Sequence, residues 1–157
     1  MSLDGKLTVV ADHPGGLGLG IGREFARNGR TVIITSRNKT NLKKVCNLID
    51  KNCYGFQLNV SKKRSLVKFI ENISKDFSNI DILINNAGFP LEWKIWLKNV
   101  HDISEVEFMN IIQVDLIGSF RVTREIIKLM MKKRVELSSI FLQPLPYPDI
   151  FAVLRTL

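Results

Sequence analysis

Five glycines within eight positions are the first residues whose spacing suggests chemistry. They follow a short apolar run, Leu7–Ala11, and lead into an amphipathic stretch, Leu17–Asn28. A glycine-rich turn between a strand and a helix lets the backbone approach a pyrophosphate closely, and the free amides at the helix N-terminus bind the anion. The glycines are Gly15, Gly16, Gly18, Gly20 and Gly22. Because glycine clusters also form plain tight turns, the turn alone leaves both interpretations open.

The elements that would position this turn alternate along the chain. Short apolar or β-branched runs predict buried strands, and longer stretches with apolar residues at helical spacing predict amphipathic helices. The expected strands are 7–11, 31–35, 56–60 and 81–85. The expected helices are 17–28 (ended by Gly29), 41–51, one capped by Ser61, and one from a capping box at Ser104-x-x-Glu107 to about Lys133. This order predicts an α/β fold, a doubly wound parallel sheet with helices on both faces.

The regular alternation breaks after Arg134. Val135–Ile140 could form a fifth strand, but the three prolines within Gln143–Pro148 cannot continue a central strand. We expect Asp149–Leu157 to have no partner element and to leave an uncovered sheet edge. The predicted sheet is therefore incomplete at the C-terminus.

The net charge is +8, from 23 Lys and Arg against 15 Asp and Glu. The basic residues lie in separate runs on the expected solvent side of helices, without interleaved aromatic residues. These runs are Lys43-Lys44, Lys62-Lys63-Arg64 and Lys132-Lys133-Arg134. We interpret them as solvated helix faces ahead of attraction for a polyanionic cofactor, and we do not expect nucleic acid as a partner.

The two cysteines and the hydropathy bear on location. Cys46 and Cys53 have no metal or redox spacing, so two reduced thiols in a cytoplasmic protein are expected. Apolar stretches fall short of the ~20 residues that a membrane span needs, and Met1–Gly5 is too polar for a signal peptide. We expect no membrane association.

Several short motifs occur at matching places in the strand–helix order. These are Asp4-Gly5-Lys6 before the first strand, Ser36-Arg37 after the second, Asn59-Val60 at the expected end of the third, and Asp81-Ile-Leu-Ile-Asn-Asn-Ala-Gly88 at the fourth. Together with the glycine turn they resemble the classical short-chain dehydrogenase/reductase family over about residues 2–134. We therefore expect residues 1–134 to be a Rossmann-like dinucleotide-binding domain and 135–157 an aberrant tail.

The resemblance implies a set of cofactor-binding residues. Gly16, Leu17 and Gly18 would line the diphosphate, and Asn59 and Val60 would flank the adenine, with Asn59 where the family usually has Asp. Asn85, Asn86, Ala87 and Gly88 would support the central sheet and border the nicotinamide ribose. Aligned without gaps, the first family glycine falls on Asp12, whose carboxylate would repel a pyrophosphate unless it is neutralised or turned away.

Cofactor choice depends on the end of the second strand. NAD-specific sites place a carboxylate there for the ribose 2′-hydroxyl, whereas NADP sites remove it and add a cation for the 2′-phosphate. Ser36 followed by Arg37 therefore favours NADP over NAD. The alternative for Arg37 is a surface side chain that contacts nothing.

The catalytic residues implied by the resemblance are incomplete. Asp115 stands where the family has a catalytic Asn, and Ser139 only superficially resembles its catalytic Ser. The family's Tyr-x-x-x-Lys pair, which protonates the carbonyl, is missing, because Tyr147 has no Lys four residues later. Phe89–Ile103, with its two tryptophans Trp93 and Trp96, would overhang the substrate or pack in the core.

The tail has a second interpretation at the level of its codons. Each shifted codon takes the third base of one codon and the first two bases of the next. In this frame the codons of Val135–Asp149, with two bases from Ile150, can encode Gly-Val-Ile-Ile-Asn-Ile-Ser-Ser-Thr-Pro-Ala-Ile-Ser-Gly-Tyr. The segment Leu137–Phe141 then becomes Ile-Ile-Asn-Ile-Ser, similar to the family's fifth strand and its Ser. We hypothesise a frameshift near Arg134.

The intact family member is then expected to transfer hydride between NADP(H) and a carbonyl or secondary alcohol, as a homo-oligomer. The chain as printed is expected to be inactive. The alternative is a non-enzymatic dinucleotide-binding or interaction module.

Overall fold

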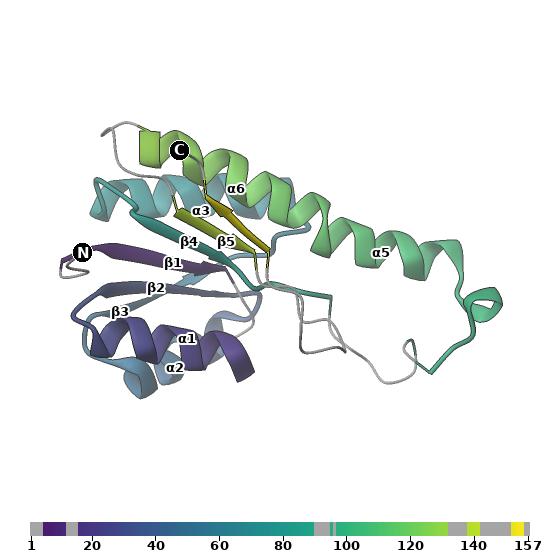
Figure 1. Cartoon of the computed structure of the whole chain (residues 1–157), viewed down its shortest axis with the longest axis horizontal. Coiled ribbons are helices and arrows are strands. Elements are labelled where there is room, and N and C mark those ends of the chain that lie inside the picture. The colour runs from purple at the N-terminus through teal and green to yellow at the C-terminus, as the bar shows by residue number, and fades with distance from the viewer. Residues whose placement is uncertain are drawn as a thin grey trace.

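The chain forms one twisted sheet with the strand order β3-β2-β1-β4-β5-β6 (Figure 1). A computed structural model describes residues 5–11, 16–89, 95, 97–131, 138–141 and 152–155. The strands are β1 Leu7–Ala11, β2 Thr31–Ser36, β3 Cys53–Gln57, β4 Ile82–Asn85, β5 Ser138–Phe141 and β6 Ala152–Arg155. Strands β1 to β5 pair in parallel, and β6 pairs with β5 antiparallel. The predicted doubly wound parallel sheet is confirmed.

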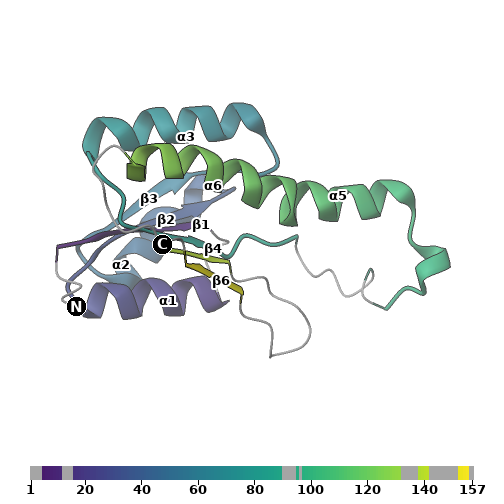
Figure 2. The ribbon, with the colours of Figure 1, turned by 45° about the horizontal axis from the view of Figure 1, so that its top comes forward.

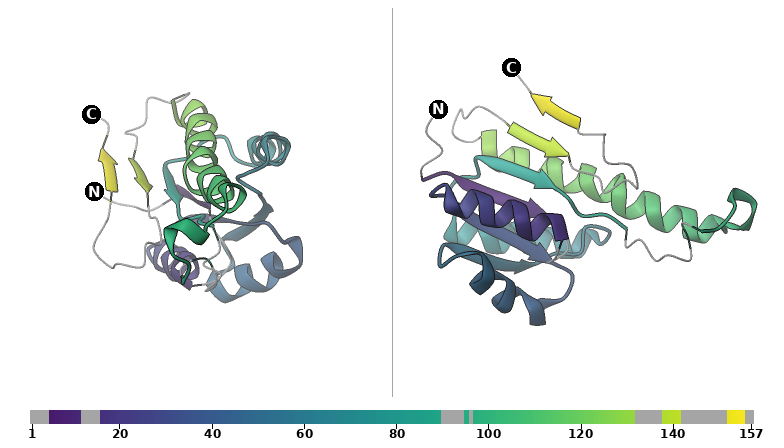
Figure 3. Two further views of the ribbon diagram at one scale, coloured as in Figure 1. Left: turned by 90° about the vertical axis from the view of Figure 1, so that its right-hand side faces the viewer. Right: turned by 60° about the horizontal axis from the view of Figure 1, so that its bottom comes forward.

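Helices cover both faces of the sheet, in the layers that Figure 2 separates. The α-helices are α1 Gly16–Arg27, α2 Leu42–Ile49, α3 Lys63–Asp76, α5 Glu105–Asp115 and α6 Ile117–Met130. Two short 3-10 helices, η1 Lys39–Asn41 and η2 Val100–Asp102, precede α2 and α5. Helices α1 and α2 lie on one face and α3 and α6 on the other, while α5 continues from α6 beyond the sheet (Figure 3).

Burial on both faces explains why the strand sequences are continuously apolar. All five residues of β1 are buried, and successive side chains of a strand point to opposite faces. On one face Val9 and Leu83 pack in a cluster with Phe69 of α3 and Val122 of α6. On the other face Val10 lies in a cluster with Phe25 of α1.

The third strand begins and ends earlier than predicted. Strand β3 ends at Gln57, so Asn59 and Val60 lie in the loop that follows it. The prediction of 56–60 was wrong because Leu58 and Val60 are apolar and buried, at 2% and 7% exposure, although they belong to a loop. Their burial comes from packing in the core and not from a place in the sheet.

Helix starts and ends were predicted with mixed success. The Ser61 cap was wrong, because Lys62 holds the cap position of α3. The capping box was right: the Ser104 N–H donates to Glu107 Oε2 at 2.9 Å, and the Glu107 N–H donates to Ser104 Oγ at 3.3 Å. Gly29 follows α1 with φ +76°, as expected of a helix-ending glycine. The long helix expected from the capping box is divided at Leu116 into α5 and α6.

The tail contributes strands to the sheet. The fifth strand expected within Val135–Ile140 is found at Ser138–Phe141, parallel to β4. The expectation that Asp149–Leu157 has no partner was wrong, because Ala152–Arg155 pairs with β5 and covers its edge. The proline segment Gln143–Pro148 lies outside the described residues.

Among the described residues, helices long and apolar enough to cross a membrane are absent.

Candidate functional site

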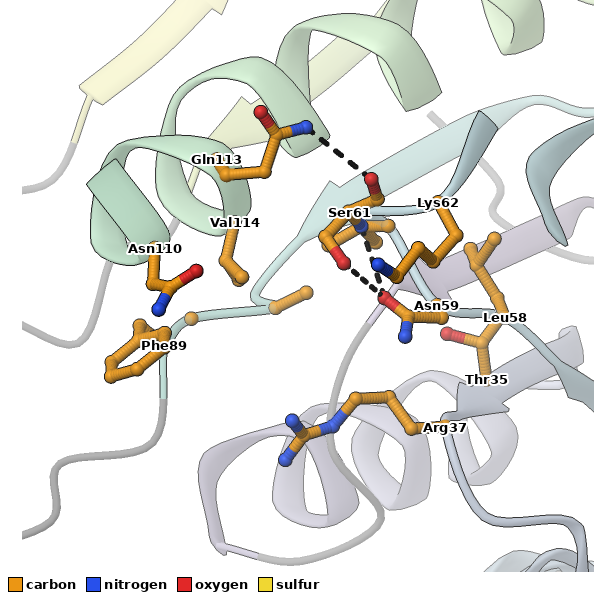
Figure 4. Close-up of a pocket in the computed structure, with 13 residues that line it drawn as sticks. Thr35, Arg37, Leu58, Asn59, Ser61, Lys62, Phe89, Asn110, Gln113 and Val114 are labelled. Carbon is orange, nitrogen blue, oxygen red and sulfur yellow. Dashed lines mark hydrogen bonds between the residues drawn. The ribbon is translucent and has the colours of Figure 1, made fainter. Parts of the chain in front are cut away.

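A cavity of about 200 Å³ lies beyond the carboxyl ends of the central strands (Figure 4). The carboxyl edge of a doubly wound sheet is where such folds bind ligands. The wall of the cavity is formed by the end of β2, the loop after β3, the loop after β4 and one side of α5. The lining residues are Thr35, Arg37, Leu58, Asn59, Val60, Ser61, Lys62, Ala87, Gly88, Phe89, Asn110, Gln113 and Val114.

The turn after β2 holds the Arg37 guanidinium at this cavity. Ser36 is buried, and its Oγ accepts a hydrogen bond from the Asn38 N–H at 3.1 Å. Gln57 Nε2 donates to the Arg37 carbonyl at 3.0 Å, so the backbone is fixed on both sides of the arginine. Figure 4 shows the Arg37 side chain extending from the end of β2 across the open side of the cavity. The backbone bonds therefore aim a cation at a place where a ligand can reach it.

A second, shallow hollow adjoins the same arginine. It is lined by Ser36, Arg37, Asn38, Lys39 and Gln57. Arg37 and Lys39 supply two cations here, and Lys62 supplies a third on the wall of the main cavity. Among the described residues that line the two hollows there is no carboxylate, so this end of the site favours an anion.

Asn59 is held in one orientation by the loop that follows β3. Its Oδ1 accepts from the Ser61 N–H at 3.1 Å and from Ser61 Oγ at 2.7 Å, while its own N–H donates to Ser65 Oγ at 2.9 Å. Because both hydrogen bonds from Ser61 to the side chain use Oδ1, the Nδ2 donor is the end that faces the cavity (Figure 4). An Asp at this position would present an acceptor instead.

The loop wall is tied to α5 and α6 through the Ser61 carbonyl. This oxygen accepts from Gln113 Nε2 at 3.3 Å and from Arg121 Nη1 at 3.4 Å. Gly118 allows the close approach, because a Cβ there would lie 2.8 Å from Val60 Cγ2. The helices and the loop therefore form one wall of the cavity.

The Asn-Asn-Ala-Gly segment begins at the end of β4. Asn85 Nδ2 donates to Thr123 Oγ1 at 2.9 Å, which joins the end of β4 to α6. The Asn86 N–H donates to the Ala11 carbonyl at 2.9 Å, and Asn86 Oδ1 is buried without a partner among the described residues. Ala87 and Gly88 continue into the cavity wall. Asn86 itself is not among the residues that line the cavity.

Asp115 lies at the end of α5 and binds the backbone just after this segment. Its Oδ1 accepts a hydrogen bond from the Phe89 N–H at 2.6 Å. The predicted catalytic position is thus in contact with the cavity wall. Ser139 pairs in register with Leu83, which places it inside β5, two positions before the level of Asn85. The structure does not bring Ser139 to the carboxyl edge of the sheet.

The glycine turn is described only from its second half. Gly16 opens α1 with φ +58°, a conformation that favours glycine, and Gly18 is buried against the sheet. Leu17 is exposed. These three residues are not among those that line the cavity, and Asp12 and Gly15 lie outside the described residues. Trp93 and Trp96 also lie outside them.

Sequence reasoning missed part of the site. Lys62 was interpreted first as a solvated basic residue and only second as attracting a polyanionic cofactor. Asn110 and Gln113 were not singled out, because α5 lies far from the β2 and β3 loops in the chain. Lys62 lies five residues after the end of β3, and this position near the carboxyl edge of the sheet could have indicated that it belongs to the site. The exposed-face interpretation is confirmed for Lys43-Lys44 and Lys62-Lys63-Arg64, while Lys132-Lys133-Arg134 lie outside the described residues.

Comparison with known proteins agrees with this geometry. The sequence profile described as short chain dehydrogenase matches residues 6–137. The chain belongs to the short-chain dehydrogenase family. The predicted resemblance is therefore confirmed, and the cavity occupies the carboxyl edge of a sheet that this family shares.

Curated relatives within the short-chain dehydrogenase family are bacterial reductases. The chain is 31% identical over 134 residues to the 3-oxoacyl-(acyl-carrier-protein) reductase FabG of Salmonella typhimurium, with 85% of this chain and 53% of the relative covered. It is also 31% identical over 138 residues to the protein of the same name from Aquifex aeolicus, covering 85% and 54%. The chain spans about half the length of these relatives.

Solved structures of short-chain dehydrogenases have the same fold. A 3-ketoacyl-(acyl-carrier-protein) reductase from Brucella melitensis, complexed with NADH, superposes with a TM-score of 0.73 at 28% identity, over 81% of this chain and 51% of that one. A short chain dehydrogenase from Bacillus anthracis gives a TM-score of 0.80 at 27% identity, over 90% and 56%.

Proposed function

We propose that this chain binds NADP(H) at the cavity beyond β2, β3 and β4. The intact form would transfer a hydride between NADP(H) and a carbonyl or secondary alcohol. The observation that carries the cofactor choice is the Arg37 guanidinium at the end of β2, with Lys39 and Lys62 nearby and no carboxylate among the described lining residues. A carboxylate at this place would select the 2′-hydroxyl of NAD, and a cation selects a 2′-phosphate.

The residues that line the cavity have the chemistry to bind part of such a dinucleotide. A 2′-phosphate would accept charge-assisted hydrogen bonds from Arg37 and Lys39, and an adenine would lie against Leu58 and Val60. Ala87 and Gly88, which line the cavity just after Asn86, would border the nicotinamide ribose. The bound cofactor would supply the hydride, while the chain's own residues bind and orient it.

Calorimetric titration of the 157-residue chain with NADPH and with NADH tests the cofactor choice. We expect NADPH to bind at least about tenfold more tightly, the effect of one charge-assisted contact. The pair 2′,5′-ADP and 5′-AMP isolates the phosphate, and the same preference is expected there. Equal affinities would make Arg37 a surface residue without a ligand, and tighter NADH binding would reverse the proposal.

The substrate class is proposed from the names of the relatives. The curated relatives and the Brucella melitensis structure are named as 3-oxoacyl or 3-ketoacyl reductases, which act on a carbonyl. We propose a carbonyl or secondary alcohol substrate for the intact form. The family likeness covers the half that forms the cofactor cavity and leaves the particular substrate open.

The printed chain is proposed to bind cofactor without turnover. In the sequence neither tyrosine is followed by a lysine four positions later, since Leu58 follows Tyr54 and Phe151 follows Tyr147 at that spacing. Without a positioned acid, the carbonyl oxygen has no proton donor. The second candidate function is a non-enzymatic dinucleotide-binding or interaction module. NADPH oxidation by the purified chain in the presence of 3-oxoacyl thioesters would contradict it.

The tail is proposed to arise from a shifted reading frame. The family profile match ends at residue 137, three residues after the place where the shift is expected, which supports the proposal. Resequencing the DNA from the Lys132 codon onward tests it. A Tyr-x-x-x-Lys pair in the shifted frame is the expected result, and its absence would make the tail genuine.

A homo-oligomer is proposed for the intact form. Large apolar side chains are exposed on α5 and at its junction with α6, and a second subunit would cover them. They are Val106, Phe108, Met109, Leu116 and Phe120. Light scattering on the purified protein tests this. The cytoplasmic location stays a prediction.

A further inference from the structure

Two thiols that are seven residues apart in the sequence meet in the fold. Cys46 lies in α2, and Cys53 is the first residue of β3. Their Sγ atoms are 3.1 Å apart, and both cysteines are free. The expectation of two separate thiols without a redox relationship did not anticipate this contact.

Close packing of α2 on β3 produces the contact. Cys53 and Gly55 share one face of the strand, since side chains alternate. A Cβ on Gly55 would lie 2.8 Å from Leu42 Cβ and 3.2 Å from Cys46 Sγ, so only glycine lets the helix come this near. Cys46, with Leu42 and Val45, belongs to the apolar cluster under α2, which fixes the helix in place. The two sulfurs are therefore held together by the fold.

We propose that Cys46 and Cys53 form a modification site, at which hydrogen peroxide converts the two thiols into one reversible intramolecular disulfide. The sulfurs have to approach by about 1 Å to reach the bond length of ~2.05 Å. Cys53 is partly exposed, which gives a small oxidant or reductant a way in, while Cys46 is buried. Neither cysteine lines the cavity or the shallow hollow beside it.

The hydrogen bond between the thiols decides the order of the steps. The Cys53 thiol donates to Cys46 Sγ, which lowers the pKa of Cys46 and raises that of Cys53. The Cys46 thiolate attacks one peroxide oxygen, forming a sulfenic acid and releasing hydroxide, which takes the Cys53 proton to give water. The Cys53 thiolate then attacks the Cys46 sulfur, and the leaving hydroxide takes up a proton to give a second water. Two thiols are oxidised, and one peroxide is reduced to two waters.

Tryptic mapping of the oxidised chain tests the proposal directly. Trypsin cleaves after Lys44, Lys51 and Lys62, so Cys46 and Cys53 fall on separate peptides, 45–51 and 52–62. After peroxide treatment we expect an intact mass lower by about 2 Da, the loss of two hydrogens. The two peptides should then elute as one cross-linked species that dithiothreitol separates.

Two controls keep the outcome unambiguous. In Cys53→Ser the cross-link is expected to be absent, and dimedone added together with urea, which exposes the buried Cys46, is expected to capture its sulfenic acid. Mixing isotope-labelled and unlabelled chains before oxidation is expected to give no hybrid cross-links. Recovery of both peptides as separate alkylated species, or of hybrid cross-links between two chains, would overturn the proposal.

Discussion

The Phe89 backbone N–H donates a hydrogen bond to Asp115 Oδ1 at 2.6 Å, joining the segment after β4 to the end of α5. Both groups are partly buried, and Phe89 lines the cavity. A carboxylate accepts such a bond strongly, so the contact fixes one wall of the site. We therefore expect Asp115 to position this wall through its acceptor oxygen.

Asp115→Ala should lower the free energy of unfolding by about 1–3 kcal/mol, because the Phe89 N–H loses a charged acceptor. NADPH affinity should fall with it. Asp115→Asn retains an acceptor oxygen, so most of both losses should be recovered. Urea unfolding and calorimetry measure the two quantities, with the exposed Asp76→Asn as the control. Equal losses in the Ala and Asn variants would mean that the charge of Asp115, and not its acceptor, is what matters.

Arg37→Ala should weaken NADPH binding by about 10- to 100-fold and leave NADH binding nearly unchanged, because the proposed partner of the guanidinium is the 2′-phosphate, which NADH lacks. The matched control is Arg27→Ala, which removes the same exposed charge from the far end of α1. A similar loss for both cofactors would show that Arg37 supports the turn after β2 and not the phosphate. Raising the salt concentration should reduce the NADPH preference.

Gly118→Ala should destabilise the fold by about 1–3 kcal/mol, since overpacking forces neighbours to move. Its Cβ would lie 2.8 Å from Val60 Cγ2 and 3.3 Å from the Gln113 carbonyl oxygen. Cofactor affinity should fall as well, because Val60 lines the cavity. Gly20→Ala is the matched control: it meets nothing within 4 Å inside α1 and should stabilise the helix by about 0.5–1 kcal/mol. If Gly118→Ala is as stable as the parent chain, α6 can move away from Val60 without a cost in stability, which would contradict the prediction.

The stability of the first turn of α5 should depend on pH, because Glu107 stabilises this turn only when it is ionised. Hydrogen bonds from Lys98 and from Ser104 lower the pKa of Glu107 from 4.5 to about 2. Because the folded pKa is depressed, the stabilisation is complete above pH 4.5 and is lost as the pH falls toward about 2. Carboxylate chemical shifts followed by NMR measure this pKa. The side chain is 29% exposed, so added salt should raise the pKa toward its ordinary value.

Glu107→Gln should remove this part of the pH dependence of stability. Glu105 is a neighbouring acid in the same first turn, and Glu105→Gln should leave that pH dependence unchanged. A Glu107 pKa near 4.5 in the folded chain would contradict the capping geometry.

Local sequence patterns predicted much of the fold. The apolar runs of β1, β2 and β4, the capping box at Ser104 and the helix end at Gly29 each depend on residues close together in the chain, so their interactions are visible in the sequence. The Asn-Asn-Ala-Gly segment likewise indicated the family. These features follow from backbone geometry and local hydrogen bonding, which need no knowledge of distant contacts.

The tertiary structure decided the rest. Val60 is buried because α6 packs on its loop and not because it belongs to a strand. Strand β6 forms by pairing with the edge of β5. The Asp115–Phe89 bond and the Cys46–Cys53 contact likewise join different elements, and α5 reaches the cavity from a distant part of the chain. The sequence determined the helices and the apolar strands β1, β2 and β4, because their patterns lie within short stretches of the chain. Only packing between elements determined which side chains meet.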